Sequence, residues 1–249
     1  MRSTSSTQRA LVRPAAFGFF RGLKRNNRRE WFEARRVVYE REVREPLKAL
    51  VEEIDVRLAG FAPEIVGDPR RSLFRIHRDI RFSKDKSPYK TNAGCWFFHR
   101  DAGKAVGAEA ASGGAGFYFH LEPASCFIGG GIWMPARPAL NRLRAAIAED
   151  PRPLQRILRG TVFHRRFGGL DQEHMLKRMP RGFVDDHPAG PLLRYQSFTV
   201  GRVLRDREVL SPRLAAGLSK DYTLMLPLVR WLNGALGFAP AKARIGRAS

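Results

Sequence analysis

Residues 91–133 carry the clearest signal of the fold, in the runs TNAGCWFFHR (91–100), FYFHLE (117–122) and CFIGGGIW (126–133). Each run is rich in aromatic or β-branched residues and ends at a turn or a break, which is the pattern of β-strands. Their close succession predicts an antiparallel meander. Residues 101–116 are rich in Ala and Gly without periodicity, so we expect a flexible loop between two of the strands.

Two more strands extend this sheet. In residues 74–82 (FRIHRDIRF), apolar residues alternate with polar ones, which is the period of a half-buried strand. Residues 194–203 (RYQSFTVGRV) have the composition of a further strand. The sequence therefore predicts a central, mostly antiparallel sheet of about five strands.

Helical patterns lie on both sides of the strands. Residues 17–24, and a run that begins near Arg28, have apolar residues at helical spacing, and Pro46 is expected to start a new helix that Gly60 ends. Further helices are predicted at 138–149, 154–158 and 211–236. Pro227 should kink or split the last of these. This order indicates an α+β fold in which N-terminal and C-terminal helices flank the sheet.

Length and composition narrow the class of protein. The chain has 249 residues, which suffice for one domain, and we assign it to residues 15–238, with disordered basic tails at 1–14 and 239–249. No run approaches the roughly 20 apolar residues of a membrane-spanning helix, and the first tail lacks the apolar core of a secretory signal. With only two cysteines, a disulfide framework is not expected. We therefore predict a cytoplasmic protein without membrane contact.

Charge is the unusual bulk property, because 45 Lys and Arg residues face 24 Asp and Glu residues and give a net charge of +21. Such a surface attracts anionic ligands and polyanions at long range. A general enrichment in arginine would give the same total, so the charge alone does not establish a function.

The densest cluster of charge is residues 75–90, RIHRDIRFSKDKSPYK. If residues 74–82 form a strand, Asp79 shares a face with Arg81 at a spacing of roughly 6.5–7 Å, within ion-pairing reach. Arg78 then falls on the other face, where burial of an unpaired guanidinium is costly. Arg78 must therefore find a carboxylate, backbone carbonyls or a ligand anion, unless a bulge turns it outward.

The turn after this strand displays more cations and an aromatic ring. Arginine offers a planar fork for phosphate or carboxylate, and lysine offers a mobile point charge. We therefore predict an anion-binding site whose ligand-binding residues are Arg78, Arg81, Lys84, Lys86, Tyr89 and Lys90, with the Tyr89 ring free to stack on a planar ligand. Asp79 and Asp85 are candidates to orient the cations or to act in catalysis. The alternative is a salt-bridged strand followed by a solvated basic turn.

Other clusters supply further candidates. Asn27 either caps the helix that follows it or lies at the rim of the same pocket. Arg181 precedes two acids and a histidine, a set that also fits an ordinary loop. The glycines at 129–131 favour a bulge and do not match a phosphate-binding loop. No Cys or His spacing is typical of zinc, so no metal is predicted, and any cofactor is undetermined.

Several of these motifs together resemble the domain of unknown function 2461 family. The matching pieces, in the same order within roughly residues 16–236, are RNNRREWF at 25–32, RDIRFSKDKSPYKTN at 78–92, GGGIWMP at 129–135 and MPRGF at 179–183. The resemblance implies a mostly bacterial, soluble, single-domain protein, and it brings no known activity. Carried over by position, it points to Arg78, Asp79, Arg81, Phe82, Lys84, Asp85, Lys86, Pro88, Tyr89 and Lys90. The tails and the expanded 101–116 loop depart from the family pattern.

Three classes of function stay open. A protein that binds or transforms an anionic, phosphate-bearing small molecule should have a concave pocket where the motif residues converge. A nucleic-acid-binding protein should have a broader basic stripe and a salt-sensitive affinity, although no recognised DNA- or RNA-binding motif is present. A structural or interaction domain would use the motif only to stabilise its fold. The sequence decides neither catalysis nor oligomeric state.

Overall fold

The computed structural model describes residues 9–81, 83–102 and 113–241. Its strands form one sheet in the order β1-β2-β3-β4-β5, and every neighbouring pair is antiparallel. They are β1 (Ile65–Val66), β2 (Ala93–His99), β3 (Gly116–Leu121), β4 (Phe127–Ile132) and β5 (Phe198–Val203). The predicted meander and the α+β class are therefore confirmed.

The strand predicted over residues 74–82 is wrong. Isolated bridges at Leu73 and His77 replace a continuous ladder, and the segment folds back on residues 88–96 as an irregular ribbon. Pro88 has no N–H to donate to a ladder, although its carbonyl accepts from Arg78 N–H at 2.9 Å. The inward face of the 74–82 segment is only partly apolar, since Ile76 is buried but Arg78 takes the next inward position, so little holds the register of a strand. The outer position of the sheet belongs instead to the short β1.

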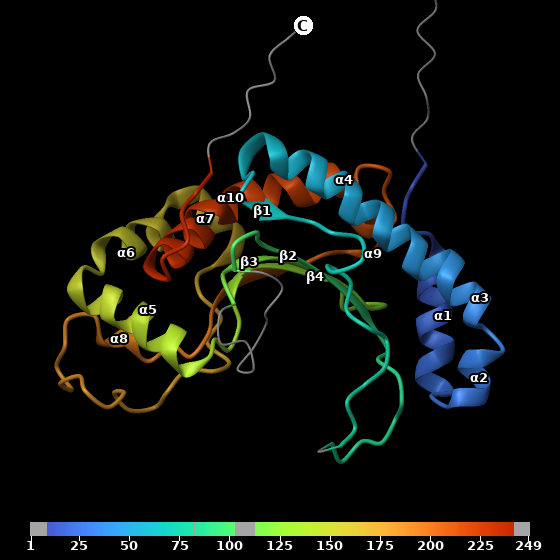
Figure 1. The fold of residues 1–249 in the computed structure, drawn as a ribbon, viewed down its shortest axis with the longest axis horizontal. Helices are drawn as coiled ribbons and strands as arrows, with labels where there is room; N and C mark the ends of the chain where they lie inside the picture. The colour runs from blue at the N-terminus through green and yellow to red at the C-terminus, as the bar shows by residue number, and fades with distance from the viewer. Residues whose placement is uncertain (1–8, 82, 103–112, 242–249) are drawn as a thin grey trace, which may run out of the picture.

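The helices enclose one face and both ends of the sheet. They are α1 (Pro14–Arg25), α2 (Arg29–Glu33), α3 (Arg36–Tyr39), α4 (Glu45–Phe61), α5 (Arg137–Glu149), α6 (Arg152–Arg159), α7 (Thr161–Phe167), α8 (Gly190–Leu193), α9 (Asp206–Val209) and α10 (Leu214–Ala235). Figure 1 shows α4 and α10 lying over the arched sheet, with α1–α3 at one end of the molecule and α5–α8 at the other. The predicted flanking by N-terminal and C-terminal helices is thus confirmed.

Two prolines disturb the helices less than expected. A π-helical turn, Glu40–Arg44, joins α3 to α4, and Pro46 lies in the first turn of α4 directly after it. Pro227 lies inside α10, which continues on both sides of it as one helix. Packing of buried leucines against the sheet holds α10 together across the proline.

Alternate residues of each strand divide between the two faces of the sheet. Phe117 on β3 is fully buried and stacks on Tyr222 of α10, with 4.6 Å between ring centroids. On β4, a Cβ atom placed on Gly130 would meet Met225 of α10, so Gly130 faces the same helix. Tyr118, the next residue on β3, points the other way and is only half-buried. The core therefore lies between the sheet and α10, and the opposite, concave face is open.

The described part of the fold extends slightly beyond the predicted domain boundaries. Val12 is 1% exposed and packs into the core, and α1 begins at Pro14. Residues 1–8 and 242–249 of the predicted tails, and residues 103–112 of the predicted loop, lie outside the described residues. Within the described ranges, no helix has the length and apolar character needed to cross a membrane.

Candidate functional site

A cleft of about 720 Å³ lies on the concave face of the sheet. Its floor is formed by β2 to β5, and one wall is formed by Arg75, Arg78 and Lys90 of the irregular ribbon. Trp133, together with acidic residues of the segment that follows α7, lines the opposite wall. Figure 1 shows these two segments descending on either side of the arch, away from α4 and α10.

Glycines line the floor of the cleft and leave space that side chains would otherwise fill. Gly131 has a φ of +127° and its Cβ would lie 2.0 Å from the carbonyl oxygen of Phe198, so the backbone itself requires glycine. Gly129 differs, because its nearest neighbour would be the Val200 carbonyl oxygen at 3.4 Å, an ordinary contact. The fold therefore does not require a glycine at 129, and the missing side chain leaves space in the cleft.

The ribbon wall concentrates positive charge. Arg75 and Lys90 form no ion pair with any carboxylate in the described part of the chain. Burial, and secondly the charge of Arg75, lower the pKa of Lys90, whose Nζ lies 5.6 Å from the centroid of the Phe74 ring. An anion bound between Arg75 and Lys90 would raise the pKa of Lys90 again, because a nearby negative charge stabilises the protonated amine.

Arg78 pairs with a carboxylate, which is one of the alternatives that the sequence left open. It donates to Asp85 and has a side chain that is 30% exposed, so the predicted need for a partner is met within the ribbon. Because Arg78 has further N–H groups, it can bind Asp85 and still present a donor to the cleft.

Asp79 and Asp85 form ion pairs and hydrogen bonds within the motif. Asp79 accepts from Arg81 at 2.6 Å, and Asp85 accepts from Ser87 N–H at 2.9 Å as well as from Arg78. Hydrogen bonds from Arg81 lower the pKa of Asp79 to about 2, and those from Ser87 lower the pKa of Asp85 to about 2. Such carboxylates stay ionised and are weak bases at neutral pH, so the geometry favours the orienting role over the catalytic one.

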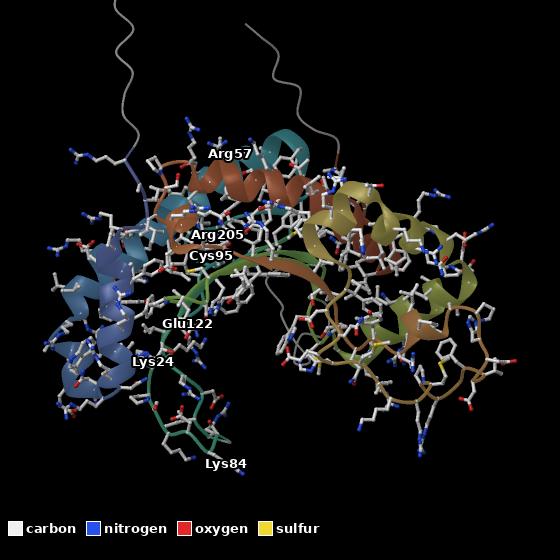
Figure 2. All side chains as sticks on the ribbon, turned by 180° about the vertical axis from the view of Figure 1, so that it is seen from behind. Lys24, Arg57, Lys84, Cys95, Glu122 and Arg205 are labelled. Carbon is white, nitrogen blue, oxygen red and sulfur yellow. The ribbon has the colours of Figure 1, made fainter. Side chains whose placement is uncertain are left out.

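Three of the predicted ligand-binding cations lie away from the cleft. Arg81, Lys84 and Lys86 are exposed and do not line it. Arg81 is paired with Asp79, and Lys86 Nζ donates to the Ile80 carbonyl at 2.9 Å. Figure 2 shows Lys84 at the far tip of the ribbon, well separated from Cys95 in the sheet.

Tyr89 and Asn27 hold the ribbon against the N-terminal helices. The Tyr89 side chain is buried and stacks on Phe32, with 4.2 Å between ring centroids, so its ring has no open face for the predicted ligand. Asn27 Nδ2 donates to the Tyr89 carbonyl at 2.9 Å, and Tyr89 N–H donates to Asn27 Oδ1 at 3.1 Å. Neither residue lines the cleft.

Two further candidates were named from the sequence. Arg181 is exposed and does not line the cleft, and Phe82 lies outside the described residues. In the ranges that the structure describes, no three His, Cys, Asp or Glu side chains are grouped to hold a metal ion.

Several residues of the cleft were not singled out from the sequence. Trp96 and Tyr118 on the floor were predicted only as strand positions, and Asp171 and Glu173 on the far wall had no prediction. A weak signal exists in the alternation of small and large residues along the strands. The register that sets Tyr118 beside Gly129, and Gly129 beside Gly201, comes only from strand pairing.

Comparison with known proteins places the chain in a family. A family model described as "Conserved hypothetical protein (DUF2461)" matches residues 15–231. The chain belongs to this family. Every residue that lines the cleft lies within the DUF2461 region. No curated protein and no solved structure matched the chain.

Proposed function

We propose that the protein binds an anionic small molecule in the cleft on the concave face of the sheet. A phosphate or carboxylate group would lie against Arg75, Arg78 and Lys90, and a flat, mainly apolar part would lie on the floor. The proposal is supported above all by one observation: Arg75 and Lys90 converge on this wall without a carboxylate partner among the described residues. Two cations held close together repel each other, and a bound anion offsets this repulsion.

The floor supports the flat part of the ligand. Trp96, Tyr118 and Phe127 contribute aromatic surface, and the glycines between them add no bulk. Trp133 stands at the rim and is 52% exposed, so part of its ring is open to a ligand. A mainly apolar hollow with a few convergent charges, and with a volume of several hundred Å³, is the usual form of a small-molecule site.

The test is a binding measurement with two aryl anions, phenyl phosphate and 4-sulfamoylbenzoate, read by thermal shift and calorimetry. A ligand that binds only the native state raises the melting temperature. In Lys90→Met, the affinity should fall about 10- to 100-fold, the equivalent of about 1.5–3 kcal/mol for a charged hydrogen bond. Lys84→Met is the matched control, because it removes the same charge at the tip of the ribbon and should leave the affinity unchanged. Equal losses in both variants would refute the site.

Nucleic-acid binding is the second candidate, because it would use the exposed cations at the ribbon tip and the net charge of +21. It makes the opposite prediction for the same variants. Affinity for a short oligonucleotide would fall in Lys84→Met, would be insensitive to changes inside the cleft, and would decrease steeply with salt.

A further inference from the structure

Tyr118, His120 and Glu122 form a chain of hydrogen bonds beside the cleft. They alternate along and just beyond β3, so their side chains share the concave face of the sheet. Tyr118 Oη lies 3.0 Å from His120 Nδ1, and His120 Nε2 lies 3.2 Å from Glu122 Oε2. Tyr118 lines the cleft, and His120 lines the hollow next to it.

The direction of these hydrogen bonds follows from the chemistry of the three groups. An ionised carboxylate only accepts, so Glu122 requires the proton of the imidazole on Nε2. The Nδ1 atom of His120 is then the acceptor, and the Tyr118 hydroxyl is its donor. The phenol oxygen keeps its lone pairs for a ligand in the cleft. A nucleophile or base, a proton acceptor and an orienting carboxylate are the three parts of the triads that activate hydroxyl groups.

Packing holds the tyrosine and the histidine in this arrangement. A Cβ atom on Gly94 would lie 2.4 Å from Tyr118 Oη, so the absence of a side chain at Gly94 lets the phenol lie across β2. The Phe127 ring stacks on the His120 ring, with 4.5 Å between centroids. Phe74, which lies beneath Lys90, meets the Tyr118 ring edge-on at 6.0 Å. The hydroxyl is thus near the cationic wall and fixed in direction.

We propose that Tyr118 is a catalytic base that removes a proton from a ligand in the cleft and passes its own proton to His120. The X–H bond of the ligand breaks and X keeps the electron pair, while Tyr118 Oη gains that proton and His120 Nδ1 gains the phenolic one. Glu122 is a positioning residue that balances the imidazolium, and the cationic wall stabilises the new negative charge. The substrate class is an anionic molecule with an acidic X–H group, so this step rests on the proposed function.

The surroundings suit proton transfer near neutral pH. Burial lowers the pKa of His120 despite the opposing effect of Glu122, so the imidazole is neutral and able to accept a proton. Burial, and secondly Cys95 on β2, raise the pKa of Tyr118, so the phenol keeps its proton until His120 takes it. Arg202 and Asp171 also line the hollow beside His120.

The test measures how fast Tyr118 reacts with benzenesulfonyl fluoride, an uncharged probe, by mass spectrometry of the intact and digested protein. The phenol oxygen bonds to sulfur, fluoride leaves, and the phenolic proton passes to His120. Relative to N-acetyltyrosinamide, Tyr118 should react faster, and the rate should fall about 100-fold in His120→Gln, the scale of general base catalysis. The wild-type rate should rise with pH around a midpoint below the ordinary histidine value, and this dependence should disappear in the variant.

Glu122→Gln gives a second measurement that keeps the side-chain shape. The amide can donate to Nε2, which reverses the tautomer, so His120 donates to Tyr118 and the reaction slows. Equal rates in the wild type and in either folded variant would overturn the relay. With 4-carboxybenzenesulfonyl fluoride, the wild type should react faster than with the uncharged probe, and Lys90→Met should lose that gain. If the wild type reacts no faster with the carboxylated probe than with the uncharged one, the anion site is overturned. The relay still stands in that case, provided that the rate with the uncharged probe depends on His120.

Discussion

Among single residues, Gly129 and Gly131 lie two positions apart on β4 and differ in what the fold demands of them. Gly131 adopts a backbone conformation that other residues avoid, and a Cβ atom there would meet the backbone of β5. Gly129 has room for a side chain. A glycine in a strand interior costs free energy relative to alanine, so its presence at 129 is explained better by the cleft than by the sheet.

Substitution at Gly129 should separate binding from stability. We expect Gly129→Ala to raise the free energy of unfolding by about 0.5–1 kcal/mol, because alanine loses less backbone entropy. Gly129→Leu should fill the floor and remove detectable binding of phenyl phosphate. Urea denaturation and calorimetry provide the two measurements. Gly131→Ala is the control for backbone strain and should lower the free energy of unfolding by more than about 1 kcal/mol. If Gly129→Leu still bound phenyl phosphate with the wild-type affinity, the cleft would not be the binding site.

At the level of elements, the irregular ribbon is attached to the N-terminal helices rather than to the sheet alone. The side chain of Asn27 makes paired hydrogen bonds with the backbone N–H and carbonyl of Tyr89, in addition to the backbone bonds within the ribbon. Stacking of Tyr89 on Phe32 adds an apolar contact to the same junction. Because Lys90 directly follows Tyr89, this junction also holds Lys90 in place at the wall of the cleft.

Asn27→Ala should loosen this junction. The substitution leaves one N–H and one C=O of Tyr89 without their partner, and we expect a loss of about 1–3 kcal/mol in stability. Hydrogen exchange should accelerate selectively in residues 75–90, measured by mass spectrometry. Asn26→Ala is the control, because the Asn26 amide bonds locally to the Gly22 carbonyl. Unchanged exchange in the ribbon would contradict the role given to Asn27.

For the whole molecule, a buried charge joins three elements behind the sheet. Asp221 on α10 is 1% exposed and accepts from Arg166 on α7 at 2.6 Å and from Arg202 on β5 at 2.9 Å. Arg202 is also paired with Glu208 of α9. This cluster holds the outer strand β5 to the helices, and β5 contributes to the floor of the cleft.

Asp221→Asn should therefore weaken the entire fold. The substitution removes two charged hydrogen bonds from the buried Asp221, which costs about 1.5–3 kcal/mol, because Arg202 keeps Glu208 and Arg166 is partly exposed to water. The expected result is a large drop in melting temperature, measured by calorimetry. Asp150→Asn makes the same chemical change in the exposed pair with Arg152 and should cost no more than about 1 kcal/mol. Similar losses in the two variants would show that burial does not set the strength of the Asp221 cluster.

Prediction from sequence succeeded where the physical cause is local. Four of the predicted strands and the flanking helices match the structure, because alternation and helical spacing reflect burial of nearby residues. The strand over residues 74–82 failed for a non-local reason: Ile76 packs into the core, but the segment meets residues 88–96 only through isolated bridges. Tyr89 was expected to face a ligand, but it is covered by Phe32, which is distant in sequence.

The α+β class, the family and the pairing of Asp79 with Arg81 could all be inferred from the sequence, because they depend on residues that lie close together in the chain. By contrast, it takes the folded structure to show that Lys90, Gly129 and Tyr118 border one cleft while Lys84 lies apart at the ribbon tip. The physical reason is strand register. Shifting a strand by one residue exchanges its two faces, and the pairing that sets the register is made between distant segments.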